Sequence, residues 1–370
     1  MTDSIDTDTS WMQTALSLAR KGEGKTRPNP PVGCVLVKGN QLVGKGYHRQ
    51  AGGRHAEIHA LRDAGSAAKG SVAYVTLEPC STRGRTGPCT EALIQAGITR
   101  LVAACQDPYP GHNGRGLRKL RAAGIVVSHG VCRAEAEKLI APFKMWTCAK
   151  RPFITLKLGM TVDGKIADRD GKSKWITSRE SRQHVQALRR RVDAIMVGRG
   201  TAVADDPALT CRPGRNPAPL RVITDSRGRL PLSARLLNDD FVMYTVVATT
   251  TQCSARRQAA YRRKGAEVWV IPGRGQRVSL VPLMNKLAEH EIIHVLCEGG
   301  SEMATALIKG NLVDEYVLFI APSMLGGRAS ALTDTGKGWQ LANCPRLRFE
   351  TVRRIGDDIM IVARPLTSGV

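Results

Sequence analysis

A histidine, a glutamate and two cysteines stand at spacings that suit a hydrolytic zinc site. His55 and Glu57 open a segment with helical spacing, Cys80 follows a Glu-Pro pair, and Cys89 follows a proline further along. One histidine and two cysteines bind Zn²⁺ while its fourth position stays open for water. Zinc lowers the pKa of that water, and Glu57 could carry its proton to a leaving nitrogen. The pattern predicts His55, Cys80 and Cys89 as metal ligands and Glu57 as the catalytic proton shuttle.

The positions of these residues along the chain support that interpretation over a zincin motif. His55 and His59 have the spacing of a zincin, but that motif needs Glu directly after the first His, where this chain has Ala56. His59 is therefore interpreted as a packed or surface residue. His55 and Glu57 can face one metal only at a helix start, because they lie on different faces of a helix interior. Cys89 also falls at a predicted helix start, where the helix dipole favours the thiolate.

Helical and strand patterns alternate around these residues in the first 150 positions, which predicts a largely parallel α/β sheet. The basic stretch 147–153 then separates two halves, so we expect domains at 1–148 and 149–370. The patterns predict helices over 11–22, 55–65, 89–97, 116–123 and 133–146, a hairpin over 33–48, and strands over 71–79, 99–105 and 125–130.

The second half repeats the α/β alternation, which predicts a second α/β domain. Its predicted strands cover 153–164, 193–200, 220–226, 242–250, 267–272, 292–300 and 314–322, and its predicted helices cover 178–191, 255–265, 280–290 and 301–311.

The second half carries weaker chemical signals. Gly299-Gly300 joins a predicted strand to a predicted helix, where free backbone N–H groups can cradle a dinucleotide pyrophosphate. The same pair also suits a simple tight turn, and a G-x-G-x-x-G fingerprint is absent. Trp175 could stack on a nicotinamide or fill a core. Taken one at a time, these features favour the structural interpretation.

Composition limits the class of protein. The formal net charge is +23, which suits anionic partners, either nucleic acid or phosphorylated metabolites, or reflects Lys/Arg usage on solvated faces. Aromatic residues make up 4%, which leaves few rings for stacking single-stranded nucleic acid. No apolar run approaches the roughly 18 residues of a membrane span. The polar start MTDSIDTDTS does not suit a signal or transit peptide, so we expect a cytoplasmic protein without membrane contact.

The first half resembles a known family. His-x-Glu, Pro-Cys and a second Cys are similar to the cytidine-deaminase-like zinc signature, although STRGRTGP here replaces the usual two-residue spacer. With RPNPPVGCVLV and GKGYH, this half resembles the deaminase half of the bacterial bifunctional enzymes of riboflavin biosynthesis. The resemblance implies that Asn29 and His48 contact the base and that Arg85 meets the phosphate. Thr82 stands where similar sequences often have His, and because a hydroxyl can donate and accept, the resemblance implies that Thr82 contacts the substrate in an altered way. Tyr109 stands where a small polar residue is common.

The second half resembles the reductase half of the same family, which has a dihydrofolate-reductase-like fold. The segments LKLGMTVDGKIA, GKSKWITS, VGRGTAVADDPALTCR, CEGGSEMATAL and IAPSMLGG occur in that order. The resemblance implies NADPH as hydride donor and Lys157 as the group that polarises or protonates the sugar carbonyl. Arg189 has an alternative as part of a solvated helix face. The implied NADPH contacts are Gly159, Trp175, Thr201, Asp205, Ser226, Gly300, Ser301, Glu302, Met303, Ala304, Thr305 and Ala306. The implied substrate contacts are Ser173, Arg189, Leu209, Arg212 and Glu298.

The resemblance implies two reactions in sequence. The first is zinc-dependent deamination of 2,5-diamino-6-ribosylamino-4(3H)-pyrimidinone 5′-phosphate, and the second is NADPH-dependent reduction of the ribosyl group to ribityl. We therefore expect small phosphorylated pyrimidines as substrates, no nucleic acid, and a homo-oligomer built through the reductase half. The alternative is a nucleic-acid base deaminase with an appended binding domain, which the charge favours and the scarce aromatics oppose. A module with a relic zinc site is opposed by the complete ligand set with Glu57.

Overall fold

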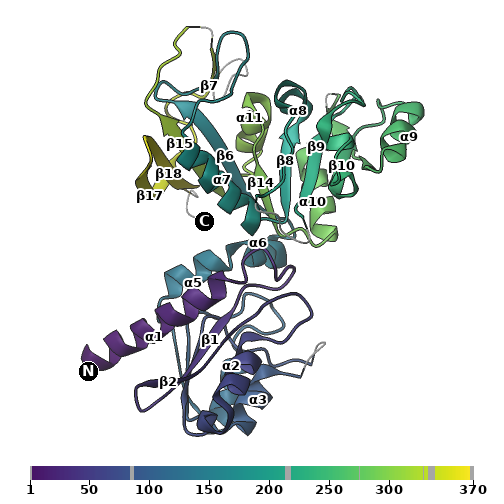
Figure 1. Cartoon of the computed structure of the whole chain (residues 1–370). Helices are drawn as coiled ribbons and strands as arrows, with labels where there is room; N and C mark the ends of the chain where they lie inside the picture. Colours follow the sequence, from purple (N-terminus) through teal and green to yellow (C-terminus); the bar gives the residue numbers. More distant parts are fainter. Residues whose placement is uncertain are drawn as a thin grey trace. The chain divides into compact units, whose positions relative to one another are not determined.

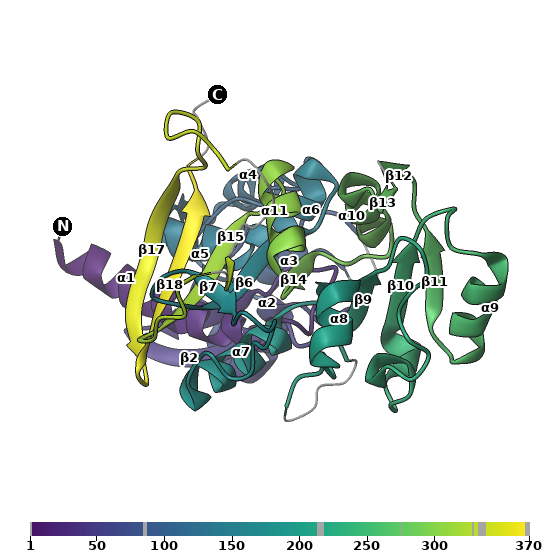
Figure 2. The ribbon, with the colours of Figure 1, turned by 90° about the horizontal axis from the view of Figure 1, so that it is seen from above.

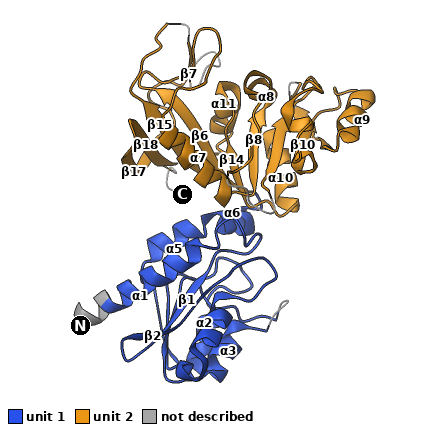
Figure 3. Cartoon of the chain, in the orientation of Figure 1, with its two compact units in different colours: residues 1–151 blue, residues 152–370 orange. Residues whose placement is uncertain are grey.

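The chain consists of two compact units, Met1–Arg151 and Pro152–Val370 (Figure 3). The structure is a computed structural model, and it describes residues 2–83, 87–212, 218–274, 276–327, 329–331 and 338–366 (Figure 1). The boundary expected between 148 and 149 falls inside the last helix of the first unit, α6 (Ala141–Ala149).

The first unit is a sheet covered by helices on both faces. Its described strands lie in the order β2-β1-β3-β4-β5, with β1 antiparallel to both neighbours and β3, β4 and β5 parallel. The strands are β1 (Gly33–Lys38), β2 (Gln41–Tyr47), β3 (Val72–Val75), β4 (Arg100–Ala103) and β5 (Val126–His129). The helices are α1 (Thr2–Arg20), α2 (Ala56–Ala64), η1 (Gly65–Ala68), α3 (Cys89–Gln95), α4 (Arg115–Ala122), α5 (Arg133–Leu139) and α6 (Ala141–Ala149).

The alternation of side chains along β1 divides the apolar core of this unit in two. Cys34 and Leu36 face one side, where α2, α3 and α4 pack, whereas Val35 and Val37 face α1 and α5. Both faces are buried, which explains why the strand is an unbroken apolar run. The starts of α2 and α3, which carry the predicted metal ligands, therefore lie over the same face of the sheet.

The second unit is a larger mixed sheet. Its described strands lie in the order β11-β10-β9-β8-β14-β6-β15-β18-β17, parallel from β11 to β15 and antiparallel at β18 and β17. Figure 2 shows the β17–β18 hairpin at one edge of this sheet and β11 toward the other. The strands are β6 (Phe153–Thr161), β7 (Lys165–Ala167), β8 (Ala194–Gly198), β9 (Leu220–Thr224), β10 (Thr245–Thr249), β11 (Glu267–Val270), β12 (Gly273–Arg274), β13 (Arg277–Val278), β14 (His294–Cys297), β15 (Glu315–Ala321), β16 (Ser330–Ala331), β17 (Leu347–Ile355) and β18 (Asp358–Pro365). The helices are α7 (Arg179–Arg191), α8 (Arg199–Asp205), η2 (Arg235–Leu237), η3 (Val242–Tyr244), α9 (Ala255–Arg263), α10 (Leu280–Glu289) and α11 (Ser301–Lys309).

Helices cover both faces of this sheet as well. Leu283 of α10 and Leu307 of α11 enter one apolar cluster, while Ala202 of α8 and Tyr261 of α9 enter the cluster on the opposite face. The α/β class predicted for both halves is confirmed.

Three element predictions are corrected by the structure. The largely parallel sheet predicted for the first unit is mixed, because β1 runs antiparallel to β2 and β3. The helix predicted over 11–22 begins already at Thr2. Asp8, in the added part of this helix, accepts hydrogen bonds from Tyr74 and Arg100 and so attaches that part to the sheet. The helix predicted over 133–146 is two helices, because Pro142 cannot donate a helical hydrogen bond and instead stands at the start of α6.

The sequence reasoning missed the hairpin of β17 and β18. Their register joins Leu347 to Pro365 and Ile355 to Asp358, around a turn in which Gly356 has a φ of 59°. Two strand-like runs around a short glycine turn were the available signal. The helix α8 was also missed, because its sequence was interpreted only as a glycine pair after a strand.

Gly46 lets α2 approach the sheet, so a side chain there should displace the start of that helix. A Cβ at Gly46 would lie 2.4 Å from the carbonyl oxygen of Ala56 and 2.5 Å from the backbone nitrogen of Ala60. We expect Gly46→Ala to lower the stability of the first unit by about 1–3 kcal/mol and to lower zinc content. Gly87→Ala is the control, because no atom of the described residues beyond its chain neighbours lies within 4 Å of a Cβ at that position. Calorimetry measures the stability and metal analysis measures the zinc content. Equal stability and equal zinc content in the two variants would contradict this account.

Candidate active sites

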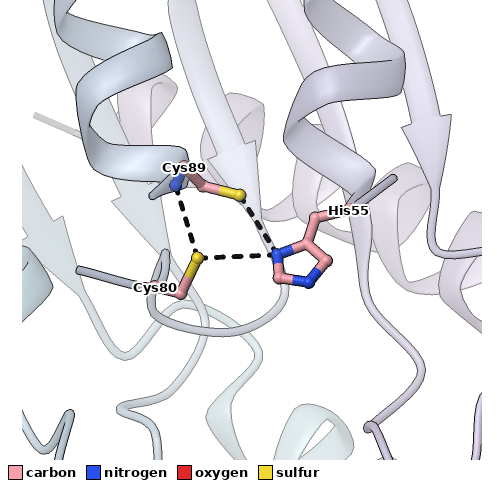
Figure 4. A group of neighbouring side chains, drawn as sticks. All are labelled: His55, Cys80 and Cys89. Carbon is pink, nitrogen blue, oxygen red and sulfur yellow. Dashed lines mark hydrogen bonds between the residues drawn. The ribbon is translucent and has the colours of Figure 1, made fainter. Parts of the chain in front are cut away.

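The predicted metal ligands meet in the first unit. His55 Nδ1 lies 3.2 Å from Cys89 Sγ and 3.5 Å from Cys80 Sγ, and the backbone N–H of Cys89 donates to Cys80 Sγ at 3.3 Å (Figure 4). All three ligand atoms lie within 4.8 Å of one another. A tetrahedral zinc with bonds of about 2.0–2.3 Å needs ligand atoms roughly 3.5 Å apart. The donor set and its spacing therefore fit Zn²⁺.

Each ligand is placed by the end of an element. His55 immediately precedes α2 and has extended backbone angles, and Cys89 is the first residue of α3. Cys80 lies in the loop after β3, where its carbonyl accepts from the backbone N–H of Thr90. Glu78, two residues before Cys80, is 3% exposed and accepts from the backbone N–H groups of Asp107, Gly114 and Gly116. This buried carboxylate thus ties the Cys80 loop to residues 107–116.

The electrostatics of this cluster favour a thiolate and a protonatable carboxyl group. The hydrogen bond with Cys89 lowers the pKa of Cys80 to about 4, and the same bond raises the pKa of Cys89. The hydrogen bond with Cys80 raises the pKa of His55. Burial, with the charge of Cys80, raises the pKa of Glu57 to about 7. The charges of Cys80 and His55 both act on the pKa of Glu57, so its carboxyl group stands near the predicted ligands.

Asn29 and His48 are hydrogen-bonded to each other next to the cluster. His48 Nδ1 lies 3.0 Å from the carbonyl oxygen of Arg54, which can only accept, so Nδ1 carries the proton. Burial lowers the pKa of His48, which favours the neutral ring, and in that form Nε2 accepts from the Asn29 amide nitrogen at 3.2 Å. The His48 ring meets the His55 ring edge to face at 5.4 Å. The amide oxygen of Asn29 is thereby oriented as an acceptor.

Thr82 has a partner that the sequence reasoning did not find. Its hydroxyl lies 2.8 Å from His112 Nε2, and His112 Nδ1 lies 2.8 Å from Asp107 Oδ2. Tyr109, singled out in the sequence, meets the His112 ring edge to face. The only signal for His112 was its place in the loop DPYPGHNGRG, and spacing alone does not pair it with Thr82. Arg85 lies outside the described residues.

The second unit contains a cavity of about 1240 Å³ that collects most of the sites predicted there. Among the residues predicted to meet NADPH, those in its lining are Gly159, Trp175, Thr201, Asp205, Ser226, Gly300, Ser301, Glu302, Met303 and Ala306. The predicted substrate residues Ser173, Arg189, Leu209, Arg212 and Glu298 also line it, together with Lys157. Ala304 and Thr305 are buried on the core side of α11, so a contact from them would involve the backbone.

Glu298 lines this cavity and binds two cationic side chains there, Arg189 and Lys157. Its carboxylate accepts from Arg189 at 2.6 and 3.1 Å and pairs with Lys157 Nζ at 3.0 Å. Burial alone would raise the pKa of Glu298, but Arg189 and Lys157 outweigh it and hold the pKa at about 2. The Arg189 side chain is 13% exposed, so its interpretation as part of a solvated helix face is wrong.

The glycine turn before α11 lines the cavity and packs closely against its neighbours. The backbone N–H of Gly300 donates to Thr201 Oγ1 at 3.1 Å, just before the N-terminus of α11. A Cβ at Gly299 would lie 2.7 Å from Met303 Cβ, so the turn needs glycine to stay close to the helix. Ser173 Oγ donates to Asp205 Oδ1 at 2.9 Å and joins two predicted site segments.

Trp175 is 70% exposed, so its interpretation as a core residue is wrong. The Arg182 guanidinium lies 4.5 Å from the centre of its ring. Arg182, Gln186 and Arg189 share one face of α7 and all line the cavity, and Gln186 accepts from the backbone N–H of Arg212 at 2.9 Å. The i, i+4, i+7 spacing of these polar residues was a sequence signal for Arg182 and Gln186 that the sequence reasoning missed.

Comparison with known proteins decides the family. The RibD C-terminal domain model matches residues 152–361, and the cytidine and deoxycytidylate deaminase zinc-binding region matches residues 5–105. The RibD proteins of Aquifex aeolicus and Escherichia coli are each 42% identical over 96% of this chain, covering 97% and 98% of their own lengths. The chain belongs to the RibD family. It is accordingly a bifunctional enzyme of riboflavin biosynthesis with a deaminase and a reductase half, as the sequence predicted.

Solved RibD structures agree with this assignment. Acinetobacter baumannii RibD, form 1, superimposes with a TM-score of 0.88 at 37% identity and covers 98% of this chain and 100% of its own. A Thermotoga maritima diaminohydroxyphosphoribosylaminopyrimidine deaminase/5-amino-6-(5-phosphoribosylamino)uracil reductase gives 0.85 at 32% identity, covering 98% and 99%. Within the described residues, no helix combines the length and apolarity needed to cross a membrane.

Loss of the Glu298 charge should destabilise the second unit. Glu298→Gln leaves Lys157 and Arg189 without a buried counter-charge, which costs about 3–5 kcal/mol. The native pKa lies below the ordinary value, so this stability is complete above about pH 4.5 and is lost as the pH falls toward 2. Thermal unfolding at pH 7 and pH 3 should therefore show a large difference between variant and parent that shrinks in acid. Glu302→Gln, at an exposed position, is the matched control.

Proposed function

We propose that the first unit deaminates 2,5-diamino-6-ribosylamino-4(3H)-pyrimidinone 5′-phosphate and that the second unit reduces 5-amino-6-(5-phosphoribosylamino)uracil with NADPH. The observation that carries this proposal is the presence of one separate cluster of functional side chains in each unit. A metal-ligand cluster with a buried carboxyl group stands in one unit, and a cation-lined cavity with a glycine turn stands in the other. The Thermotoga maritima relative is named for a deaminase and a reductase activity of the same kinds.

In the deaminase half, His55, Cys80 and Cys89 are the proposed ligands of one Zn²⁺ per chain. When bound there, zinc supplies Lewis-acid activation of water. Glu57 is buried beside the ligands, and its raised pKa suits a group that first takes and then gives a proton near neutral pH. Its proposed role is to carry a proton to the exocyclic nitrogen that leaves as ammonia.

The pyrimidine is proposed to bind against Asn29 and His48. Because the Asn29 amide nitrogen donates to His48, its oxygen can accept from an N–H or amino group of the base. His48 is in turn fixed by the Arg54 carbonyl, so this acceptor has a set direction. Arg85 is proposed to meet the phosphate, as the sequence resemblance implies.

In the reductase half, NADPH is proposed to lie along the Gly299-Gly300 turn and the start of α11, where it supplies reducing equivalents. The backbone N–H groups there suit a pyrophosphate, and exposed Trp175 offers a ring face to a nicotinamide. Lys157 is held by Glu298 at 3.0 Å and is proposed to give a proton to the sugar oxygen during reduction. Arg212 supplies a cation for the substrate phosphate.

Four exposed arginines around this cavity support an anionic substrate. The proposed partners of the whole chain are small phosphorylated pyrimidines. Arg199, Arg227, Arg229 and Arg235 line the same cavity. Assembly through the reductase half stays a prediction, and size-exclusion chromatography with light scattering would measure it.

Glu57→Gln should separate the two activities. The amide cannot take up a proton, so ammonia release should fall by at least about a hundredfold. NADPH oxidation on substrate that is already deaminated should persist, because the second site shares no residue with the first. Glu91→Gln, in the same unit and paired at the surface with Lys119, is the control and should keep both activities. Loss of both activities in a folded Glu57→Gln variant would contradict the division of labour.

Lys157→Met should produce the opposite separation. The variant keeps the aliphatic length but has no proton to give, so the reductase kcat should fall by about a hundredfold or more. Glu298 retains Arg189, so the cavity floor keeps a counter-charge. Ammonia release should continue at the parent rate. Lys264→Met, on an exposed lysine of the same unit, tests for a general effect of lost charge, and an active Lys157→Met reductase would refute the role assigned to Lys157.

A further inference from the structure

Three side chains from two loops form a hydrogen-bonded chain beside the metal ligands. Asp107 Oδ2 lies 2.8 Å from His112 Nδ1, and His112 Nε2 lies 2.8 Å from Thr82 Oγ1. Thr82 follows the ligand Cys80 by two residues and is exposed, so one end of this chain is open to a ligand. The other end is closed, because Asp107 is 7% exposed.

The surrounding backbone fixes this arrangement. Asp107 Oδ1 accepts from the backbone N–H of Tyr109 at 2.8 Å, which leaves Oδ2 for His112. The backbone N–H of Asp107 donates to buried Glu78, which lies two residues before Cys80. The loop that carries His112 and the loop that carries Thr82 are therefore held together at the metal ligands, without any contribution from the substrate.

The chain of hydrogen bonds determines what Thr82 can offer. The Asp107 carboxylate only accepts, so His112 Nδ1 carries a proton in both charge states. When the imidazole is protonated, Nε2–H donates to Thr82, and the hydroxyl hydrogen is then directed to another acceptor. The hydrogen bond with Asp107 raises the pKa of His112, which favours this state. An anionic oxygen near Thr82 would favour it further.

We propose that His112, oriented by Asp107 and acting through the Thr82 hydroxyl, is a positioning residue that directs Thr82 to a phosphate oxygen of the deaminase substrate. This inference rests on the proposed function, and it assigns roles to Asp107 and His112 that the sequence reasoning did not. It also accounts for threonine at position 82. Similar sequences often carry an imidazole at this position, whereas here the second loop supplies one.

The test measures ammonia release from the phosphorylated diaminopyrimidine and from its dephosphorylated form. Thr82→Val and His112→Phe each remove one member of the chain with little change in volume. We expect each to raise KM for the phosphorylated substrate by about tenfold or more, because a hydrogen bond to a charged group is lost, and to leave kcat within about twofold. The double variant should be no worse than the worse single variant, because both act through one hydroxyl. KM for the dephosphorylated form should not change.

Controls separate a positioning role from a structural one. Zinc content and the reductase rate on deaminated substrate should match the parent in every variant. His129→Phe, at an exposed position at the end of β5, should leave both KM values unchanged. Thr82→His in the His112→Phe background should lower KM for the phosphorylated substrate part of the way back to the parent value. This variant returns an imidazole to the same place.

Three results would overturn the inference. An unchanged KM in both single variants removes the role of His112 and Thr82. An equal rise of KM for both substrates places the contact on the pyrimidine and not on the phosphate. If the parent chain released no ammonia from either substrate, the proposed function and this inference would fail together. If the parent is active and only the KM changes are missing, this inference fails alone.

Discussion

A buried carboxylate must find partners, and this requirement organises both sites of the molecule. Glu78 is satisfied by three backbone N–H groups from residues 107–116, so the loop that carries Cys80, a proposed metal ligand, cannot move independently of the following loop. Glu298 is satisfied by Arg189 and Lys157, which come from α7 and β6 and are brought to one point at the end of β14. In each unit the glutamate fixes residues that are distant in sequence, and the polar groups left facing outward form the site.

The clustering of His55, Cys80 and Cys89 could be predicted from sequence because its information is local. His55, Cys80 and Cys89 each stand at an element end, and a helix start dictates which way the side chain points. The pairing of Thr82 with His112 could not be predicted in the same way. It depends on a loop whose path is set by Glu78, and neither residue carries a pattern that names the other. The mixed strand order of the first sheet was missed for a related reason, because alternation of strands and helices does not specify the direction of a hairpin strand.

In the second site, single residues taken alone predicted the wrong environment, whereas the residues that share one face of a helix predict the site better. Trp175 taken alone suggested a core residue, and a run of arginines suggested a solvated helix face for Arg189. The structure exposes Trp175 and buries Arg189, because the cavity runs along α7 and takes one face of that helix. Helical spacing applied to Arg182, Gln186 and Arg189 would have placed all three together. The β17–β18 hairpin was overlooked although its two runs and Gly356 turn follow ordinary strand rules.

The distribution of charge gives a physical reason for joining these chemistries in one chain. The described lining of the reductase cavity has eleven cationic and five acidic side chains, so part of the +23 net charge is concentrated where a dinucleotide and a sugar phosphate are proposed to bind. Glu298 neutralises charge at the floor, which leaves the outer arginines to attract anions. The Thr82–His112–Asp107 chain applies a different solution in the first unit, where the hydrogen bond with buried Asp107 raises the pKa of one imidazole. On these proposals, the phosphate would meet many cationic side chains in the second unit, and Arg85 together with one oriented hydroxyl in the first. The two sites would therefore differ in salt dependence, with the reductase KM rising more steeply as ionic strength increases.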